Sequence, residues 1–274
     1  MAPGFGEALG QTVLIENRAG GGGMIGSTAA AKSPPDGYTL LLGSSGSITL
    51  GPAVYKTMRY DPAKDLVPTG AIQAVPLLVT ISPKIPINNF KEFLAYSKSK
   101  RSPITMATSG VGTTNHLALE MLSHEAKIAL TNVPYKGSGA AFANVLGGQV
   151  ETMMDQVSAS LEYVRSGRLK AIAITSLKRS AQLPNVPTLD ELGLKGFDAT
   201  TFTGLFVPAG TPPAVIGKLQ AALKKVLTTE SVRERYRSLG VEMMDMSPAE
   251  FDAFLRADAA RWRKVARDAN IVLN

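Results

Sequence analysis

Residues 104–114 read ITMATSGVGTT, an apolar run followed directly by a loop of glycine and hydroxyl residues. The run Ile104–Ala107 is typical of a buried strand, and the loop after it leads into a helical stretch. Strands that alternate with helices in this way tend to lie parallel in one sheet that helices cover. This stretch therefore predicts an α/β protein.

The same alternation runs through most of the chain. The other runs predicted as strands are Thr12–Glu16, Thr39–Leu42, Leu77–Ile81, Val150–Met154, Leu169–Ile174 and Leu205–Val207. Thr211, before Pro212, is expected to cap a helix that extends to about Leu227, and the capping box 247–250 begins the final helix. A helix over 138–146 is expected to end at Gly147-Gly148, where glycine tolerates positive φ. We expect mostly parallel sheets flanked by helices.

The distribution of proline and glycine predicts two lobes. The length of 274 residues suits one large or two modest domains. Pro103 ends the polar stretch 100–103, and proline and glycine cluster at 208–213, which indicates crossings between lobes at both places. Lobe one is predicted at 1–101 with 205–274, and lobe two at 102–204. More than one connection between lobes favours hinge closure over free tumbling.

The composition narrows the function classes. The chain carries a formal net charge of +7, no cysteine and only two histidines, His116 and His124. A zinc site of the cysteine and histidine type is therefore excluded, and so is a disulfide. No window of about 18 apolar residues occurs, so no spanning helix is predicted. Nucleic-acid binding is disfavoured, because aromatic residues make up only 6% of the chain and the basic residues are scattered.

Three loops rich in glycine and hydroxyl residues follow predicted strands, namely 44–47, 108–114 and 136–139. Each loop leads into a predicted helix start, where unpaired N–H groups and the positive end of the helix dipole can hold a carboxylate or a phosphate. The alternative is that the Ser and Thr residues only cap these helices. Three such loops at the same edge of the sheet favour one ligand that all of them bind.

Asp155 directly follows the predicted strand Val150–Met154 and should project at the carboxyl end of the sheet. An amine or hydroxyl of a ligand could donate a hydrogen bond to this carboxylate. The alternative is that Asp155 caps a helix beginning near Ser158. The sequence leaves both interpretations open.

Two enzyme classes are alternatives. Residues 21–26 satisfy the glycine fingerprint of dinucleotide-binding proteins, which would make the chain an NAD(P)-dependent oxidoreductase, but no acidic residue lies about twenty positions later to hold the ribose. A serine hydrolase could be built from Ser109, His116 and Asp155. No G-x-S-x-G motif surrounds any serine of these loops, which weakens the hydrolase hypothesis.

Longer motifs occur in a fixed order along the chain. They are GQTVLIENRAGGGGMIGSTAAAKSPPDGYTLLLGSSG (10–46), YDPAKDLVP (60–68), SGVGTTNHLALEM (109–121), VPYKGSGAAFANVLGGQV (133–150), RLKAIAITSLKRSAQLPNVPTLDELG (168–193) and FTGLFVPAGTPP (202–213). In this order the motifs resemble the Bug family, also called the TctC family, of extracytoplasmic solute receptors for tripartite tricarboxylate transporters. The resemblance extends from about Gly6 to the C-terminal helix.

The resemblance implies a periplasmic receptor of the Venus-flytrap type, which is not an enzyme and needs no cofactor. The implied ligand is a small carboxylate (a di- or tricarboxylate, an amino acid or an aromatic acid), bound in an interdomain cleft and handed to the membrane subunits of the transporter. Backbone amides, hydroxyls and ordered waters hold the ligand carboxylate in such receptors. Carried over by motif, the ligand-binding residues are Ser44, Ser45, Ser109, Gly110, Gly112, Thr113, Thr114, Tyr135 and Asp155. Asp155 would select the variable end of the ligand.

The start of the chain departs from the family pattern. Family members carry a signal peptide, a first strand and a Pro/Gly-rich ligand loop ahead of the region that matches Gly6. Met1–Gly4 has neither the basic nor the apolar region of a signal peptide. We therefore expect lobe one to lack the first strand, through truncation or a mis-assigned start, and the periplasmic location follows from the resemblance alone.

Overall fold

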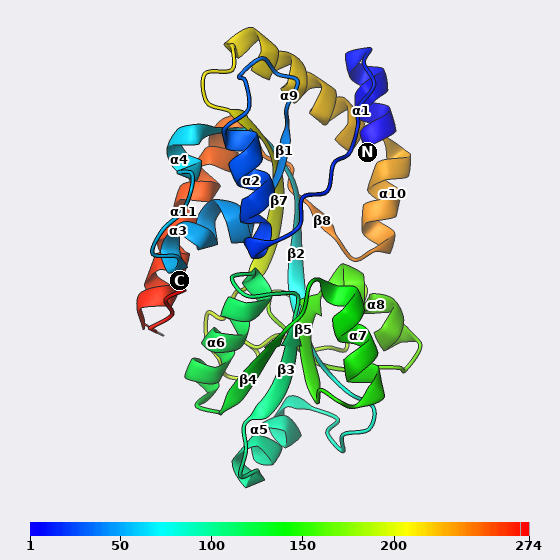
Figure 1. Ribbon diagram of the computed structural model, residues 1–274. Helices are drawn as coiled ribbons and strands as arrows, with labels where there is room; N and C mark the ends of the chain where they lie inside the picture. Colours follow the sequence, from blue (N-terminus) through cyan, green and yellow to red (C-terminus); the bar gives the residue numbers. More distant parts are fainter. Residues whose placement is uncertain (269, 274) are drawn as a thin grey trace. The chain divides into compact units, whose positions relative to one another are not determined.

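A computed structural model describes residues 1–268 and 270–273 and divides the chain into two compact units (Figure 1). Unit 1 comprises Met1–Ala74, Phe202–Lys264 and Val272–Asn274, and unit 2 comprises Val75–Thr201 and Val265–Ile271. The first boundary therefore falls at Ala74, whereas the sequence placed it near 101. The reason is that one long strand, β2 (Leu66–Ile81), serves both units, which assigns the helix after it to unit 2.

Unit 1 is built around the first half of β2. Strand β1 (Leu41–Ser44) pairs antiparallel with β7 (Thr200–Pro208), which lies beside β2, and the short β8 (Glu242–Met243) pairs antiparallel with β2. The helices of unit 1 are α1 (Ala2–Leu9), α2 (Met24–Ala31), α3 (Gly51–Val54), α4 (Pro62–Asp65), α9 (Pro213–Leu227), α10 (Glu230–Ser238) and most of α11 (Pro248–Asp268). A 3-10 turn, η1 (Gly21–Gly23), precedes α2, and a π-helix, η2 (Gly46–Leu50), follows β1.

Alternation along β7 explains why both faces of this part of the sheet are buried. Phe202 and Phe206 point to one face and pack with Phe251 of α11, whereas Leu205 and Val207 point to the other and join a cluster from α9. Successive strand residues face opposite sides, so a strand covered on both sides is apolar throughout.

Unit 2 has a sheet of mixed direction. Strand β3 (Ile104–Thr108) pairs in parallel with β4 (Leu130–Pro134) and with β5 (Thr152–Gln156). The second half of β2 pairs antiparallel with β5 and with β6 (Lys170–Ile174). The helices of unit 2 are α5 (Phe90–Ser99), α6 (Thr114–Ala126), α7 (Ser138–Gly147) and α8 (Val157–Arg165).

The α/β class is confirmed, with corrections to individual strands. The expectation of mostly parallel sheets holds around β3 but not around β2, because β2 runs opposite to the strands that flank it in unit 2. The predicted strand Thr12–Glu16 is not formed, since no strand of the described residues pairs with it and Leu14 and Ile15 are 86% and 63% exposed. The strand expected before the loop 136–139 is β4, for which the sequence analysis gave no range.

Most helix boundaries agree with the sequence, but Thr211 does not cap α9, because the N-cap is Pro212 and the Thr211 hydroxyl donates to Pro208 O at 2.7 Å. Helix α9 ends at Leu227 as expected, and Gly148 ends α7 in the left-handed conformation with φ of 78°. The capping box of α11 is formed, because Glu250 N donates to Ser247 Oγ at 3.3 Å and Ser247 N donates to Glu250 Oε2 at 2.7 Å. Local signals therefore fixed these ends.

We expect Gly204→Ala to lower the free energy of unfolding by about 2 kcal/mol through overpacking. A Cβ at Gly204 on β7 would lie 2.3 Å from Cζ of Phe251, a fully buried ring, and 3.1 Å from Gly70 O. Urea unfolding measures the effect.

The matched control is Gly217→Ala, at an exposed site in the middle of α9 where a Cβ would meet no atom within 4 Å. Alanine favours the helix, so this variant should gain up to about 1 kcal/mol. Equal stability of the two variants would contradict the overpacking argument.

Candidate functional site

The loop between β3 and α6 is held by its own residues. Thr113 caps α6, because its Oγ1 accepts from His116 N at 3.4 Å and also donates to Gly110 O at 2.7 Å. Gly110 and Gly112 have φ of 143° and 76°, in the region that favours glycine. The Gly112 amide donates to Nδ1 of His116 at 3.3 Å. Of the predicted ligand groups, the Thr113 hydroxyl and the Gly112 amide are thus used within the loop.

Other groups of this loop have no protein partner. Among the described residues, no hydrogen bond is made by the hydroxyls of Ser109 and Thr114. The first amides of α6, at Thr114 and Asn115, have no intrahelical acceptor by helix geometry. Hydroxyl and amide donors therefore gather at the positive end of the α6 dipole.

The loop between β4 and α7 lies against this loop. Tyr135 N donates to Thr108 O at 3.0 Å, and Gly137 N donates to Ser109 O at 3.2 Å. The Tyr135 side chain is half-buried against the cluster that contains Phe142. These two bonds bring Tyr135 and Ser109 together at the carboxyl ends of the parallel strands β3 and β4, the edge where α/β sheets bind ligands.

Asp155 lies near the end of β5 and is only 2% exposed. Its Oδ1 accepts from Asn115 Nδ2 at 2.9 Å and from Gln156 N at 2.8 Å, and Asn115 Nδ2 also donates to Met154 O. Its Oδ2 is buried without a hydrogen-bond partner. Asn115 was missed by the sequence analysis, although its place beside Thr114 at a helix start was a usable signal.

The environment of Asp155 disfavours its charged form. Burial raises the pKa of the carboxyl, and the nearby Ser138 hydroxyl, the Gln156 amide and Asn115 only partly offset the effect of burial. Within the described ranges, no group completes a hydrogen bond with Oδ2. The cap interpretation does not apply, because α8 begins at Val157 with Gln156 as N-cap. A buried carboxylate oxygen without a donor is costly, so a ligand donor would be stabilising here.

Ser44 and Ser45 belong to unit 1, where β1 ends and η2 begins. Ser45 is fully buried, and its Oγ accepts from Phe202 N at 2.9 Å, so this hydroxyl holds the loop against β7. The Ser44 hydroxyl has no hydrogen bond among the described residues. Thr49 of η2 donates to buried Asp258 at 2.6 Å, which fixes the far end of the π-helix. Single π-turns of this kind are frequent at functional sites.

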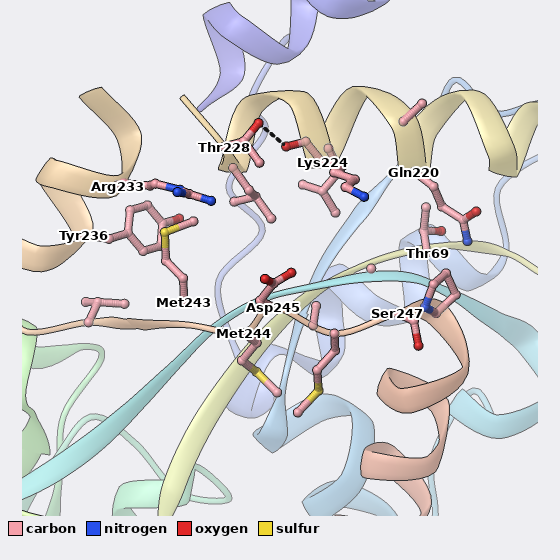
Figure 2. A pocket seen from close by; sticks show the side chains of 18 of the residues that line it. Thr69, Gln220, Lys224, Thr228, Arg233, Tyr236, Met243, Met244, Asp245 and Ser247 are labelled. Carbon is pink, nitrogen blue, oxygen red and sulfur yellow. Dashed lines mark hydrogen bonds between the residues drawn. The ribbon is translucent and has the colours of Figure 1, made fainter. Parts of the chain in front are cut away.

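A pocket of about 800 Å³ occurs elsewhere in unit 1, between α9, α10 and the segment that contains β8 (Figure 2). Lys224, Arg233, Tyr236 and Asp245 lie on its walls, and Met243 contributes apolar surface. None of the nine predicted ligand residues lines it. The pocket is therefore separate from the loops that carry the candidate site.

The geometry argues against both enzyme alternatives. In the described part of the chain no hydrogen bond joins Ser109 to His116, whose ring nitrogens face Gly112 and Glu120 instead. Asp155 is bonded to Asn115 and does not orient the histidine. The glycine fingerprint lacks the strand that should precede it, because the residues before η1 form no strand.

Two α/β units joined by several chain crossings, with hydroxyl-rich loops at strand ends, define a solute-binding receptor. The family model described as "Tripartite tricarboxylate transporter family receptor", TctC, matches residues 1–271. The chain belongs to this family of receptors, whose members are not enzymes. No described helix is long and apolar enough to cross a membrane.

Three solved structures are similar over nearly the whole chain. The periplasmic binding protein BugD is 36% identical with a TM-score of 0.93, covering 99% of this chain and 91% of its own. Rpa4515 of R. palustris, solved with adipate, is 31% identical with a TM-score of 0.93 over 99% and 91% of the two chains. MatC of Rhodopseudomonas palustris, solved with malate, is 32% identical with a TM-score of 0.90 over 96% and 91%. The fold is thus that of periplasmic binding proteins.

Proposed function

We propose that this protein captures a small carboxylate for a tripartite tricarboxylate transporter, and that the loops of unit 2 hold the ligand. The observation that carries the proposal is the buried Oδ2 of Asp155, which has no hydrogen-bond partner among the described residues. The other oxygen of this carboxyl, Oδ1, accepts a hydrogen bond from Asn115 at the start of α6. A ligand with an anionic end and a donor would satisfy both features.

The anionic end of the ligand is assigned to the start of α6. None of the nine candidate residues is cationic, so the carboxylate would be held by the free amides of Thr114 and Asn115 and by the hydroxyls of Ser109 and Thr114. Such binding uses the helix dipole and N–H donors in place of a salt bridge.

The other end of the ligand is assigned to Asp155. A hydroxyl or an ammonium group would donate to Oδ2, which favours hydroxy acids and amino acids over ligands without a donor. Malate, the ligand of MatC, has such a hydroxyl. Tyr135 would contact the ligand directly, whereas Gly110, Gly112 and Thr113 would shape the loop before α6.

The cellular context follows from the family. The partners proposed are the membrane subunits of the transporter, and the location proposed is the periplasm, where receptors such as BugD act as binding proteins. The charge of +7 suits attraction of anionic ligands.

A thermal-shift screen followed by calorimetry tests the proposal. We expect malate, and the amino acid aspartate as a second donor-bearing acid, to raise the melting temperature, because a ligand that binds only the folded state stabilises it. Adipate, citrate and benzoate complete the carboxylate set, and NAD and NADP serve as negative controls. A shift with the nucleotides alone, or with no carboxylate, would contradict the receptor proposal.

A further inference from the structure

His116 makes two hydrogen bonds around the start of α6, and its ring also lies within ion-pair distance of Glu120. It is 8% exposed, its Nδ1 accepts from Gly112 N at 3.3 Å, and its Nε2 lies 3.5 Å from Glu120 Oε1. Its own backbone amide donates to the Thr113 hydroxyl. The residue thus contacts the loop before the helix, the cap of the helix and the next turn.

These partners define the form of the imidazole. A backbone N–H can only donate, so Nδ1 must offer a lone pair to Gly112, and the ring proton must reside on Nε2. Nε2, on the other side of the ring, lies 3.5 Å from the Glu120 carboxylate. The bond that fixes the orientation of the ring is therefore the one that Nδ1 accepts from Gly112.

The Gly112 amide needs such an acceptor. Gly112 is buried with φ of 76°, and Gly110 two residues before has φ of 143°, so neither residue has a side chain of its own to restrain the turn. Glycine loses more conformational freedom than other residues when it is fixed. The imidazole satisfies the buried amide and holds the turn in one conformation.

We propose that His116 is a positioning residue for ligand capture, which holds the 109–114 loop in its binding conformation through the hydrogen bond from Gly112 N to Nδ1. The inference rests on the proposed function of this loop. It assigns to a histidine that touches no ligand the task of presenting Ser109 and Thr114 in the correct place.

Three substitutions test the contacts of the ring. The Oδ1 of Asn in His116→Asn stands at the same distance along the side chain as Nδ1 and can accept from Gly112. His116→Gln extends its polar atoms towards the position of Nε2 and cannot reach Gly112 in the same way. His116→Phe removes both contacts and keeps a flat ring.

Calorimetry with malate and adipate should show that His116→Gln and His116→Phe bind about 10-fold more weakly than the wild type, the scale of one hydrogen bond. His116→Asn should lie within about threefold of the wild type. Amide hydrogen exchange, without ligand, should show a Gly112 amide protected in the wild type and in His116→Asn but not in the other two.

Glu120→Gln is the control for the opposite side of the ring, because it keeps an acceptor for Nε2 and should leave both readouts unchanged. Equal affinities of the Asn and Gln variants, or a Gly112 amide that exchanges alike in all forms, would overturn the inference. If the wild type binds no carboxylate, the proposed function fails, while the exchange data still decide whether His116 holds Gly112.

Discussion

Asp155→Asn is expected to weaken malate binding about 100-fold, close to 3 kcal/mol. The asparagine oxygen can retain the bonds from Asn115 and Gln156, which turns the new amide NH₂ towards the position of Oδ2. A donor then faces the hydroxyl of the ligand where an acceptor is required. The substitution is nearly isosteric, so the loss reflects hydrogen bonding and not shape.

Adipate provides the matched ligand, because it carries two carboxylates and no hydroxyl. Its affinity for Asp155→Asn should equal or exceed that for the wild type, since an amide NH₂ can donate to a carboxylate oxygen. Calorimetry with both ligands on both proteins gives the four values needed. Unchanged malate affinity in the variant would reject the role proposed for Asp155.

The same variant should be at least as stable as the wild type without ligand. Burial raises the pKa of Asp155 in the folded state above its ordinary value of 3.8, so the folded state binds the proton more tightly than the unfolded state. The contribution of Asp155 to the stability of the folded protein is therefore present while the carboxyl is protonated, and it is lost as pH rises through the pKa of the folded state. The stability of Asp155→Asn relative to the wild type should therefore increase from pH 3 towards neutrality, which urea unfolding at several pH values measures.

Glu151→Ala is expected to lower the free energy of unfolding by about 3 kcal/mol. The Glu151 side chain is 14% exposed, and it accepts hydrogen bonds from Lys100 Nζ at 2.7 Å, Tyr96 OH at 2.8 Å, and Thr105 N and Oγ1 at 3.0 and 3.2 Å. These partners lie on α5, the residue after it and β3. Removing the carboxylate leaves all of them without their acceptor.

The pH dependence has the opposite sign to that of Asp155. Burial raises the pKa of Glu151, but the hydrogen bonds from Lys100, the Thr105 amide and Tyr96 outweigh burial, and the pKa is lowered from 4.5. The contribution to stability is therefore complete above pH 4.5 and is lost as pH falls through the lower folded pKa. Urea unfolding of the wild type and Glu151→Ala should converge in acid.

Glu162→Ala is the control, because Glu162 also lies in unit 2 but its side chain is 86% exposed and forms only a surface ion pair with Arg165. It should change stability little. Glu151→Gln should fall between the two variants, since the amide keeps an acceptor for Lys100 but not the charge. A loss of the same size in Glu162→Ala would show that the Glu151 contacts are not the cause.

Local sequence signals predicted those parts of the fold that depend on neighbouring residues. The capping box at Ser247, the end of α9 and the glycine end of α7 are all formed. The predictions failed where pairing with another strand determines whether a segment forms a strand. Thr12–Glu16 has a strand-like pattern but no partner strand, and β4 is a strand with little buried surface of its own that is stabilised by pairing with β3.

In the candidate site too, the sequence could not predict contacts between residues that lie far apart along the chain. The sequence placed hydroxyl-rich loops at strand ends, which the structure bears out for the loops after β1, β3 and β4. It could not separate the free Ser44 hydroxyl from that of Ser45, because the partner of Ser45 is the amide of Phe202, far along the chain. The bond between Asn115 and Asp155 likewise joins residues that no local pattern connects.

Unit 1 consists of separate segments of the chain, and this affects the order in which the two units can fold. Most of unit 2 is one uninterrupted stretch, Val75–Thr201, whereas unit 1 needs strand β7 and helices α9 to α11, which are synthesised last. Unit 2 can therefore fold while the rest is still being made, and unit 1 must wait. An early-folded unit 2 would then tether the two halves of unit 1, which reduces the entropy lost when they meet.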